Sequence, residues 1–442
     1  MPAPPDSSSP TPPRVTAPMA ESTAESVAES SPPALSATLA WLVVALLLPV
    51  GLLNYLDRQL LAAMKYSVMG DIPSIESEAR WGLMLGQFKW VYALLSPVGG
   101  YVADRFSRRL TICTSLFVWS AVTWWTGRVS TYDELLHARS LMGISEAFYI
   151  PAALALIADF HTGATRSRAV GLHQMAIYCG VIVGGFGGYV ADSPALGWRW
   201  AFTACGVVGM LYALPLALLL RDAPRTRGGT GTPALSPGRA TLELFGNFSF
   251  ILLVLYFTLP ALAGWVVRDW MPAILKQQFQ IDQGKAGVSA TLYLQVAAIL
   301  GALVGGWLAD RRMRQTPRGR IQVSACGMLL LVPAIFGVGN AWSLGAAIGF
   351  LMLFGIGWGF FDGNNMPILS QIVPPRLRAT GYGIMNLVSI SCGGVADWGF
   401  GALRDNDVPL NVIFGTFASL AIVSVGLVLL IRPRPIEDEA KV

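Results

Sequence analysis

Charge and histidine are both scarce in this sequence, and their scarcity excludes several classes of protein. Only 13% of the 442 residues are charged and 54% are hydrophobic, whereas a soluble globular domain carries about 25% charged residues. The three histidines and five cysteines form no cluster with metal-ligand spacing, so we expect no metal site. The cysteines lie singly within apolar stretches, which is typical of small packing residues and not of disulfides. These absences indicate a polytopic membrane protein without a metal or cofactor.

The formal net charge of +5 is concentrated in short loops. Such a distribution reports the orientation of a membrane protein and gives no reason to expect a nucleic-acid partner. The sequence also shows no nucleophile and base pair at catalytic spacing, so we do not expect an enzyme.

Long apolar runs separated by polar breaks give the number of membrane crossings. One crossing takes about 20 apolar residues, and backbone groups cannot stay unpaired in hydrocarbon, so each run should be a helix. We predict an all-α polytopic membrane protein with twelve transmembrane helices in two pseudo-symmetric six-helix bundles. The predicted spans are 37–62, 81–103, 109–128, 132–158, 167–191, 199–220, 247–275, 286–308, 321–339, 342–372, 380–402 and 409–431.

Polar segments separate these spans into domains. Residues 1–35 are rich in Pro, Ser, Ala and Thr and show no apolar period, so we expect a disordered tail. An N-terminal bundle then covers 36–220 and a C-terminal bundle covers 244–432. Between them, 221–243 has the composition of a flexible cytoplasmic linker, and 433–442 forms a C-terminal tail.

One phrase occurs twice, each time where an apolar run ends. Gly-Gly-Tyr-Val-Ala-Asp-Arg occupies 99–105 and Gly-Gly-Trp-Leu-Ala-Asp-Arg occupies 305–311. A duplicated half with a basic turn at matching points is typical of transporters whose substrate site lies between two repeats. The glycines permit close helix approach, and the aspartate can bind an arginine or a helix N-terminus across the halves in one state. The predicted gating positions are Gly100, Asp104, Arg105, Arg108, Arg109, Gly306, Asp310 and Arg311.

Basic residues are divided unevenly between alternate loops. The turns after both copies of the phrase, the linker and the C-terminal segment hold most of the arginines. Because cytoplasmic loops carry the excess of Lys and Arg, we expect both termini and both phrases to lie in the cytoplasm. The expected location is the inner or plasma membrane.

Four ionisable residues lie within the first and fourth predicted spans. Such groups are costly in a membrane and are functional candidates by default. Helical spacing turns Asp57 and Arg58 toward the bundle interior and places Arg139 and Glu146 two turns apart on one face, with Gly143 leaving a groove between them. The four charges can simply neutralise one another and tie the two spans together. Alternatively, a carboxylate can exchange its guanidinium partner for a proton, which frees the arginine for an anion.

The second half has fewer candidates. A polar, glycine-bearing stretch from Asp362 to Asn365 in the tenth span favours a cavity lining over a lipid face. The residues that we expect to bind substrate are Tyr55, Arg58, Arg139, Asn364, Asn365 and Asn386.

Several other charges have no assigned role at this point. Arg268 and Asp269 fit either the cavity or an outer-end pair at the water interface. Lys89 is similarly open, because a lysine can extend to the interface. Asp397 has no evident partner in the sequence.

The loop motif resembles that of the major facilitator superfamily. Gly100, Asp104, Arg105, Arg108 and Arg109 match the signature between the second and third helices, with Ser107 where glycine is usual. The resemblance covers roughly 37–431 and implies two six-helix bundles that rock around a central site.

A finer resemblance rests on Asn54-Tyr55-Leu56-Asp57-Arg58 together with Arg139-x-x-x-Gly143-x-x-Glu146-Ala147. This pair of motifs is similar to the anion:cation symporters, which carry sugar acids, hexuronates and sialic acids with protons. The resemblance implies that Asp57 and Glu146 bind the protons and that Arg58 binds the substrate carboxylate. Spinster-like transporters carry much the same motifs, and 117–123 also looks spinster-like.

Two transport functions therefore remain open. The first is proton-coupled symport of a small organic anion by alternating access, with Na⁺ in place of H⁺ as a further option. The alternative is spinster-like export of an amphipathic lipid or drug-like molecule. A substrate sensor that completes no transport cycle is a weaker third reading. The expected partners are the substrate, the coupling ion and the lipid bilayer, and we expect a monomer.

Overall fold

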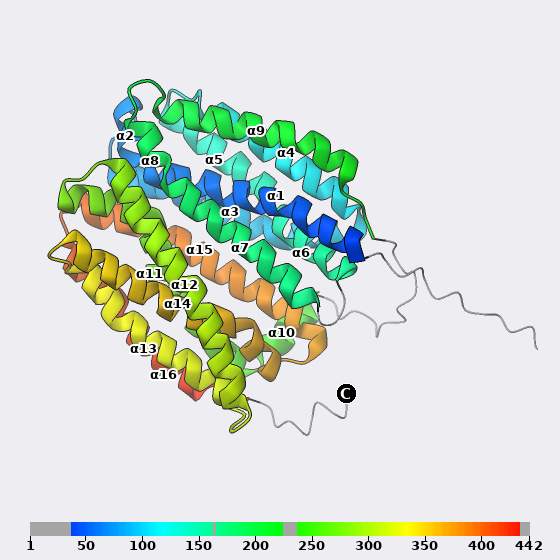
Figure 1. Ribbon diagram of the computed structural model, residues 1–442. Coiled ribbons are helices and arrows are strands. Elements are labelled where there is room, and N and C mark those ends of the chain that lie inside the picture. Colours follow the sequence, from blue (N-terminus) through cyan, green and yellow to red (C-terminus); the bar gives the residue numbers. More distant parts are fainter. Residues whose placement is uncertain (1–36, 162–164, 224–236, 434–442) are drawn as a thin grey trace, which may run out of the picture. The chain divides into compact units, whose positions relative to one another are not determined.

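A computed structural model describes residues 37–161, 165–223 and 237–433, and these residues are helical apart from short connections (Figure 1). Every predicted span corresponds to a helix or to two helices in succession. The first half contains α1 (Ala37–Ala63), α2 (Lys65–Asp71), α3 (Glu78–Arg105), α4 (Arg108–Thr126), α5 (Tyr132–Glu146), α6 (Tyr149–Phe160), α7 (Arg166–Gly185), α8 (Gly187–Asp192) and α9 (Gly197–Leu219). The second half contains α10 (Pro237–Phe245), α11 (Phe248–Phe279), α12 (Gln283–Met313), α13 (Gly319–Gly339), α14 (Leu344–Ile372), α15 (Arg378–Asp405) and α16 (Leu410–Leu430).

Nine helical segments in the described part of the chain are long and apolar enough to cross a membrane. The other three long helices, α3, α4 and α15, contain more polar residues. They pack against other helices of the protein: α4 packs against α9 in the first half, and α3 packs against α15 across the two halves. The twelve-helix architecture therefore includes three helices whose polar side chains are accommodated by neighbouring helices.

The fourth and fifth spans are broken where the sequence favours a break. Ala147 and Phe148 separate α5 from α6, and Pro151 lies in the first turn of α6, where a proline is tolerated. Phe186 separates α7 from α8. Each break lets one span bend while its backbone bonds continue on both sides.

The two halves form two helical bundles that lie side by side (Figure 1). Within the first, α1 packs on α7 and α4 packs on α9, and within the second, α12 packs on α14 and α13 packs on α16. Between the halves, α3 packs along α15, while α7 and α8 pack along α12. Since α3 and α12 are equivalent in the two halves, as are α7 and α15, the two interfaces are related by the internal repeat.

Glycines allow these paired helices to approach closely. A Cβ atom on Gly82 would lie 2.2 Å from the carbonyl oxygen of Asp397, and one on Gly401 would lie 2.2 Å from that of Glu78. In the other interface, a Cβ on Gly185 would lie 2.9 Å from the carbonyl oxygen of Gly287. Any larger side chain at these positions would push the halves apart.

Polar contacts join the halves at the end where α2 and α8 lie, which we call the closed end (Figure 1). The carboxylate of Asp405, in the last turn of α15, accepts hydrogen bonds of 2.8 Å from the backbone N–H groups of Glu78 and Ala79. Asp192, at the end of α8, accepts one of 3.1 Å from the backbone N–H of Gly284. Each half thus places a carboxylate on a helix N-terminus of the other half, where negative charge is stabilising.

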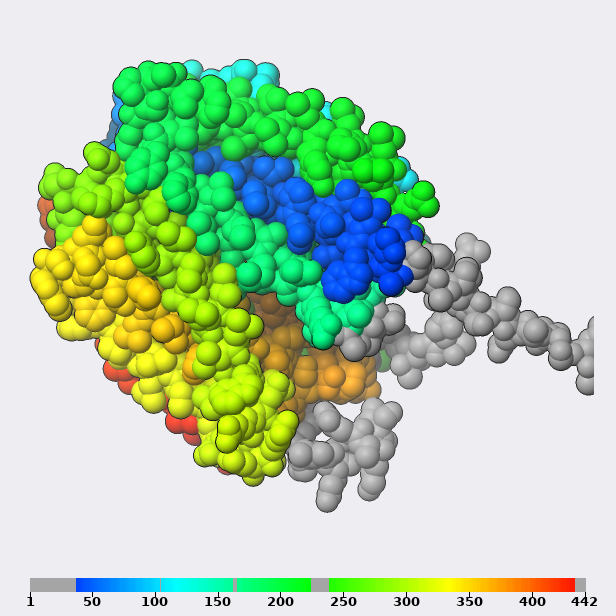
Figure 2. All heavy atoms as spheres, viewed as in Figure 1, coloured from blue at the N-terminus to red at the C-terminus, as the bar shows by residue number. Residues whose placement is uncertain are grey.

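The halves separate away from the closed end. The space-filling view shows a hollow between α7 and α12, behind which α15 is visible (Figure 2). The N-terminal end of α1 lies at this opposite end of the bundle (Figure 1). The hollow therefore leads inward from the end that bears the repeated basic turns.

The predicted linker is helical in its second part. Residues 237–245 form α10, which packs against α15 and makes an ion pair of 2.6 Å between Glu243 and Arg376, a residue in the short turn that precedes α15. The rest of the linker from 224 to 236, residues 1–36 and residues 434–442 lie outside the described part of the chain. The expected tails and the expected linker flexibility therefore remain predictions.

Candidate functional site

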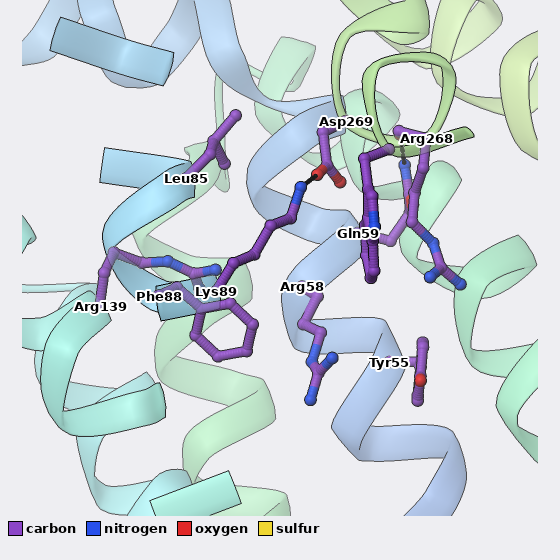
Figure 3. A pocket seen from close by; sticks show the side chains of 10 residues that line it. Tyr55, Arg58, Gln59, Leu85, Phe88, Lys89, Arg139, Arg268 and Asp269 are labelled. Atoms are coloured by element: carbon purple, nitrogen blue, oxygen red, sulfur yellow. Dashed lines mark hydrogen bonds and ion pairs between the residues drawn. The ribbon is translucent and has the colours of Figure 1, made fainter. Parts of the chain in front are cut away.

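A small pocket lies between the halves, near the middle of the spans (Figure 3). Its walls come from α1, α3 and α5 of the first half and α11 of the second. Its volume of about 20 Å³ is enough for one water molecule. The lining residues are Tyr55, Arg58, Gln59, Leu85, Phe88, Lys89, Arg139, Trp265, Arg268 and Asp269.

Arg58 is bound to Glu146 at one side of this pocket. Its Nη2 atom lies 2.6 Å from Oε2 of Glu146, and its Nε donates to the same oxygen at 2.7 Å. Its guanidinium also lies 4.8, 4.7 and 4.9 Å from the ring centres of Tyr55, Phe88 and Tyr92. The arginine is therefore a cation held in an aromatic cage, and only 15% of its side chain is exposed.

Asp57 and Arg58 turn in different directions, although both face inward. Asp57 is buried against α4, where the hydroxyl of Thr123 donates to its Oδ2 at 2.9 Å. Arg58 lines the pocket between the halves instead. The two proposed proton-binding carboxylates thus have different partners, a hydroxyl for Asp57 and a guanidinium for Glu146.

Arg139 shares an aromatic ring with Arg58. Its guanidinium lies 4.5 Å from the ring centre of Phe88, so this ring lies between two cations. The expected groove at Gly143 is wrong: a Cβ there would lie 2.8 Å from the carbonyl oxygen of Phe88, because α3 fills the space. The glycine permits close packing of α3 on α5, which brings Arg139 and Arg58 to one ring.

Several buried polar atoms near these charges make no hydrogen bond of normal geometry within the described residues. They include Oδ1 of Asp57, Oε1 of Glu146 and both amide atoms of Asn54. Buried polar groups without partners cost free energy and are uncommon in folded proteins. A proton added to either carboxylate would supply a donor to this group of acceptors.

Lys89 connects the halves on the other side of the pocket. Its Nζ lies 2.5 Å from Oδ2 of Asp269 and also pairs with Oδ2 of Asp397. It lies 4.3 Å from the ring centre of Trp265 as well. We call Lys89, Asp269 and Asp397 the triad. It settles what the sequence left open: Lys89 is buried, Asp269 faces the pocket, and Asp397 has Lys89 as its partner.

Arg268 belongs to the pocket and not to an outer-end pair with Asp269. Its guanidinium lies 5.0 Å from the ring centre of Tyr55 in the other half, and its backbone oxygen accepts from Gln59 at 3.4 Å. It also interacts electrostatically with Asp362 on α14. Arg268 therefore connects the pocket with the polar stretch of the tenth span.

The amide side chains predicted in the second half have unequal surroundings. Asn364 and Asn365 are buried, and both amide atoms of Asn365 make no hydrogen bond of normal geometry among the described residues. Asp362 is exposed, although it lies in the interior of α14. Asn386 is half-buried on α15 and interacts with Tyr382. Their role in substrate binding stays a prediction.

The repeated phrases have matching surroundings in the two halves. A Cβ on Gly99 or Gly305 would collide with a neighbouring helix, whereas Gly100 and Gly306 face open space. In the first basic turn, the carboxylate of Asp222 accepts from the Ser107 hydroxyl and, at 2.9 Å, from the backbone N–H of Arg109. Other contacts of these gating positions include Arg108 with Asp159, Asp310 with Arg320 at 2.8 Å, and Arg311 over Trp307.

These contacts leave the predicted latch function of the gating loops untested. The side chain of Asp104 lies outside the described part of the chain, and Arg105 is engaged in an interaction with another group. Carboxylates do bind helix N-termini across the halves, but Asp405 and Asp192 at the closed end provide these contacts.

Sequence reasoning missed Thr123, Phe88 and Trp265. A threonine or an aromatic residue within an apolar run carries no signal of its own, because most such residues only pack. Their part in the site depends on which charged side chain each one meets.

The twelve helices, the paired halves and the buried charges between them define a membrane transporter. A family model described as Major Facilitator Superfamily matches residues 37–396. The chain belongs to this superfamily of transporters, and the superfamily resemblance in the sequence is confirmed.

The curated relatives include spinster proteins. Protein spinster homolog 1 of Bos taurus is 29% identical over 366 residues, which cover 77% of this chain and 68% of that protein. An MFS-type efflux pump of Mycolicibacterium smegmatis is 27% identical over 369 residues, 83% of this chain and 85% of the pump. Among solved structures, a bacterial homolog of the human lysosomal transporter spinster, inward-facing and unoccupied, superposes with a TM-score of 0.73. It is 22% identical, with 90% of this chain and 95% of that chain covered, and shows the fold.

Proposed function

We propose that the protein exports an amphipathic, lipid-like or drug-like molecule by alternating access, as a spinster-like transporter. The observation that carries the proposal is the cage around Arg58, whose guanidinium lies among Tyr55, Phe88 and Tyr92. A cation within aromatic rings suits a ligand that has an anionic group beside an apolar body. The similarity to spinster proteins and to an efflux pump supports export over uptake.

The hollow between the halves fits this substrate class. It is bordered by α7 and α12 (Figure 2), and both helices carry large apolar side chains that are exposed. An amphipathic molecule can enter such a space from the lipid, because its apolar part need not leave an apolar environment. The exposed residues on the two helices include Leu172, Met175, Leu300, Leu303 and Val304.

The distribution of arginines favours one side of the membrane for the closed end. If the arginine-rich turns and both termini are cytoplasmic, the closed end faces outward and the hollow opens to the cytoplasm. The substrate would then load from the inside of the inner or plasma membrane. Opening would require Asp405 and Asp192 to leave the helix N-termini that they bind.

Protons would couple to this cycle through Glu146 and Asp57. Glu146 holds Arg58 in an ion pair of 2.6 Å, and a protonated Glu146 would lose most of the attraction to the guanidinium. Arg58 then becomes available to an anionic group on the substrate. Asp57, which accepts from Thr123, provides a second carboxylate in the same bundle.

Proton-coupled symport of a small organic anion is the second candidate. One observation favours it: the pocket that contains Arg58 has a volume of only about 20 Å³ in this conformation. A sugar acid needs less rearrangement of the lining residues than a lipid-like molecule. The coupling ion could be Na⁺ in either case, and the assay below separates the two ions.

Transport by the purified full chain in liposomes tests both functions. The panel contains a fluorescent single-chain amphipath with an anionic headgroup, the same amphipath with a neutral headgroup, and glucuronate. An internal pH dye follows protons, and replacement of Na⁺ by K⁺ tests sodium coupling. We expect pH-linked transport of the anionic amphipath, loss of transport in Arg58→Ala, and normal transport in Arg128→Ala, which removes an exposed arginine.

The result divides the candidates cleanly. Transport of glucuronate without the amphipath would replace export by organic-anion symport. Transport of the amphipath that survives Arg58→Ala would refute the role of the aromatic cage.

A further inference from the structure

We propose that Asp397, held together with Asp269 around Lys89, is a second proton-binding site that controls the opening of the closed end. The inference rests on the proposed function in one respect, since it assumes that the closed end opens during transport. It concerns a different cluster from the carboxylates of the first bundle. The ligand is a proton, and the site is built from both halves.

The triad lies between the pocket and the closed end. Lys89 is on α3 of the first half, whereas Asp269 and Asp397 are on α11 and α15 of the second. Asp397 precedes the end of α15 by eight residues, which corresponds to about 12 Å along a helix. Any separation of α3 from α15 at the closed end must therefore pull Lys89 away from Asp397.

The charges of the triad do not balance. Two carboxylates share a single ammonium group, and the side chains of Lys89, Asp269 and Asp397 are only 5%, 13% and 0% exposed. A buried net negative charge is costly, and one added proton removes it. The charged groups that face Asp397 are Lys89 from α3 and Asp269 from α11, while Arg268, Arg139 and Arg58 line the adjoining pocket.

Asp397 is the better proton acceptor of the two carboxylates. Its Oδ1 atom is buried and makes no hydrogen bond of normal geometry to any described residue. The indole Nε1 of Trp270 is also buried and lacks a hydrogen bond of normal geometry to any described residue. Asp269, by contrast, borders the pocket, where water can solvate its charge.

Protonation of Asp397 would weaken the connection between the halves. The neutral carboxyl group leaves Lys89 with one ion pair to the second half, its bond of 2.5 Å to Asp269, in place of two. The glycine contacts of α3 on α15 and the hydrogen bonds of Asp405 then hold the closed end with less support. Acidification should therefore favour opening even when no substrate is present.

Distance measurements on substrate-free protein in lipid nanodiscs test this site. Spin labels on Asp133→Cys and Trp342→Cys, exposed positions at the closed end of the two halves, report opening by double electron–electron resonance. In the wild type, the ratio of open to closed protein should rise at least about tenfold between about pH 8 and about pH 5, since linkage to one proton allows a change of up to about tenfold per pH unit. In Asp397→Asn the ratio should be high at both pH values and change less than about twofold.

Two further variants make the assignment specific. Asp407→Asn removes an exposed carboxylate at the same end and should keep the response of the wild type. A full pH response in Asp397→Asn would overturn the proposal, as would loss of the response in Asp407→Asn. If Asp397→Asn does not fold, Asp269→Asn also leaves Lys89 with one ion pair to the second half, and it removes the second negative charge that favours a proton on Asp397. Its open-to-closed ratio at about pH 8 should therefore be above that of the wild type and change less between the two pH values, and a full response of the wild-type size there would also overturn the proposal. If the protein does not transport the amphipath but its opening still depends on pH through Asp397, only the proposed function is refuted.

Discussion

Gly401 provides a direct test of how the closed end is held. A Cβ at this position would lie 2.2 Å from the carbonyl oxygen of Glu78 and 2.9 Å from the backbone nitrogen of Ala79, and real Cβ contacts essentially never fall below 3.0 Å. In Gly401→Ala, α15 and α3 must therefore move apart, and the atoms that obstruct the methyl group are backbone atoms that cannot rotate away. We expect this substitution to shift the protein toward the state that is open at this end.

The magnitude follows from overpacking. An inserted methylene group in a well-packed contact costs about 1–3 kcal/mol, and here the cost falls only on the closed state. The ratio of open to closed protein should rise roughly 5- to 150-fold. Gly399 lies two residues earlier on α15 and has nothing within 4 Å of its Cβ position, so Gly399→Ala is the matched control. Both variants gain the same helix propensity, about 1 kcal/mol, which cancels in the comparison.

Double electron–electron resonance between labels on Asp133→Cys and Trp342→Cys gives the measurement, after the five native cysteines have been replaced. The longer distance should dominate in Gly401→Ala and stay minor in Gly399→Ala. Equal distance distributions in the two alanine variants would show that the glycine contact does not hold the halves together.

Three other predictions concern the closed end and the pocket. Asp405→Asn removes the negative charge from the acceptor of two hydrogen bonds of 2.8 Å from the start of α3. It should raise the open population about fivefold, whereas the control Asp407→Asn should leave that population unchanged. A similar increase in both variants would mean that surface charge in general, and not this contact, controls opening. Phe88→Leu removes the aromatic ring that both Arg58 and Arg139 contact. It should lower the free energy of unfolding by about 1–4 kcal/mol, which thermal unfolding in detergent measures. Tyr92→Phe, which keeps an aromatic ring beside Arg58, is the control. Glu146→Gln removes the carboxylate that pairs with Arg58 and should retain substrate exchange between two equal pools while losing accumulation driven by a pH gradient. Gradient-driven accumulation in that variant would assign the coupling proton to another group.

The sequence predicted the architecture well, because the membrane makes helices visible in composition. All twelve predicted spans correspond to helices, including the polar helices α3, α4 and α15, which a search for long apolar segments does not select. The fourth span was predicted as one helix over 132–158, whereas it is divided into α5 and α6 at Ala147 and Phe148. The helix α10 was not foreseen, because its 9 residues are fewer than the roughly 11–18 over which helical periodicity is read.

The candidate site was predicted in part. Arg58, Arg139 and Glu146 stood out because a charge within an apolar run is costly wherever it points. The groove expected at Gly143 was wrong because a glycine in a helix signals close packing as readily as open space, and α3 occupies that space. From the sequence motifs alone, organic-anion symport was the first interpretation and spinster-like export the alternative. The comparisons with known proteins support the alternative better.

By itself, the sequence determined the number of helices, the duplication and the identity of the buried charges. These properties depend on local composition and on the free energy of placing each residue in a membrane. Only the tertiary structure decided which charges meet. Lys89 and Asp397 are 308 residues apart, and Asp405 binds the start of α3 across a similar separation. Such pairs depend on how two helices from different halves are rotated and packed, and glycine contacts at Gly82 and Gly401 set that packing.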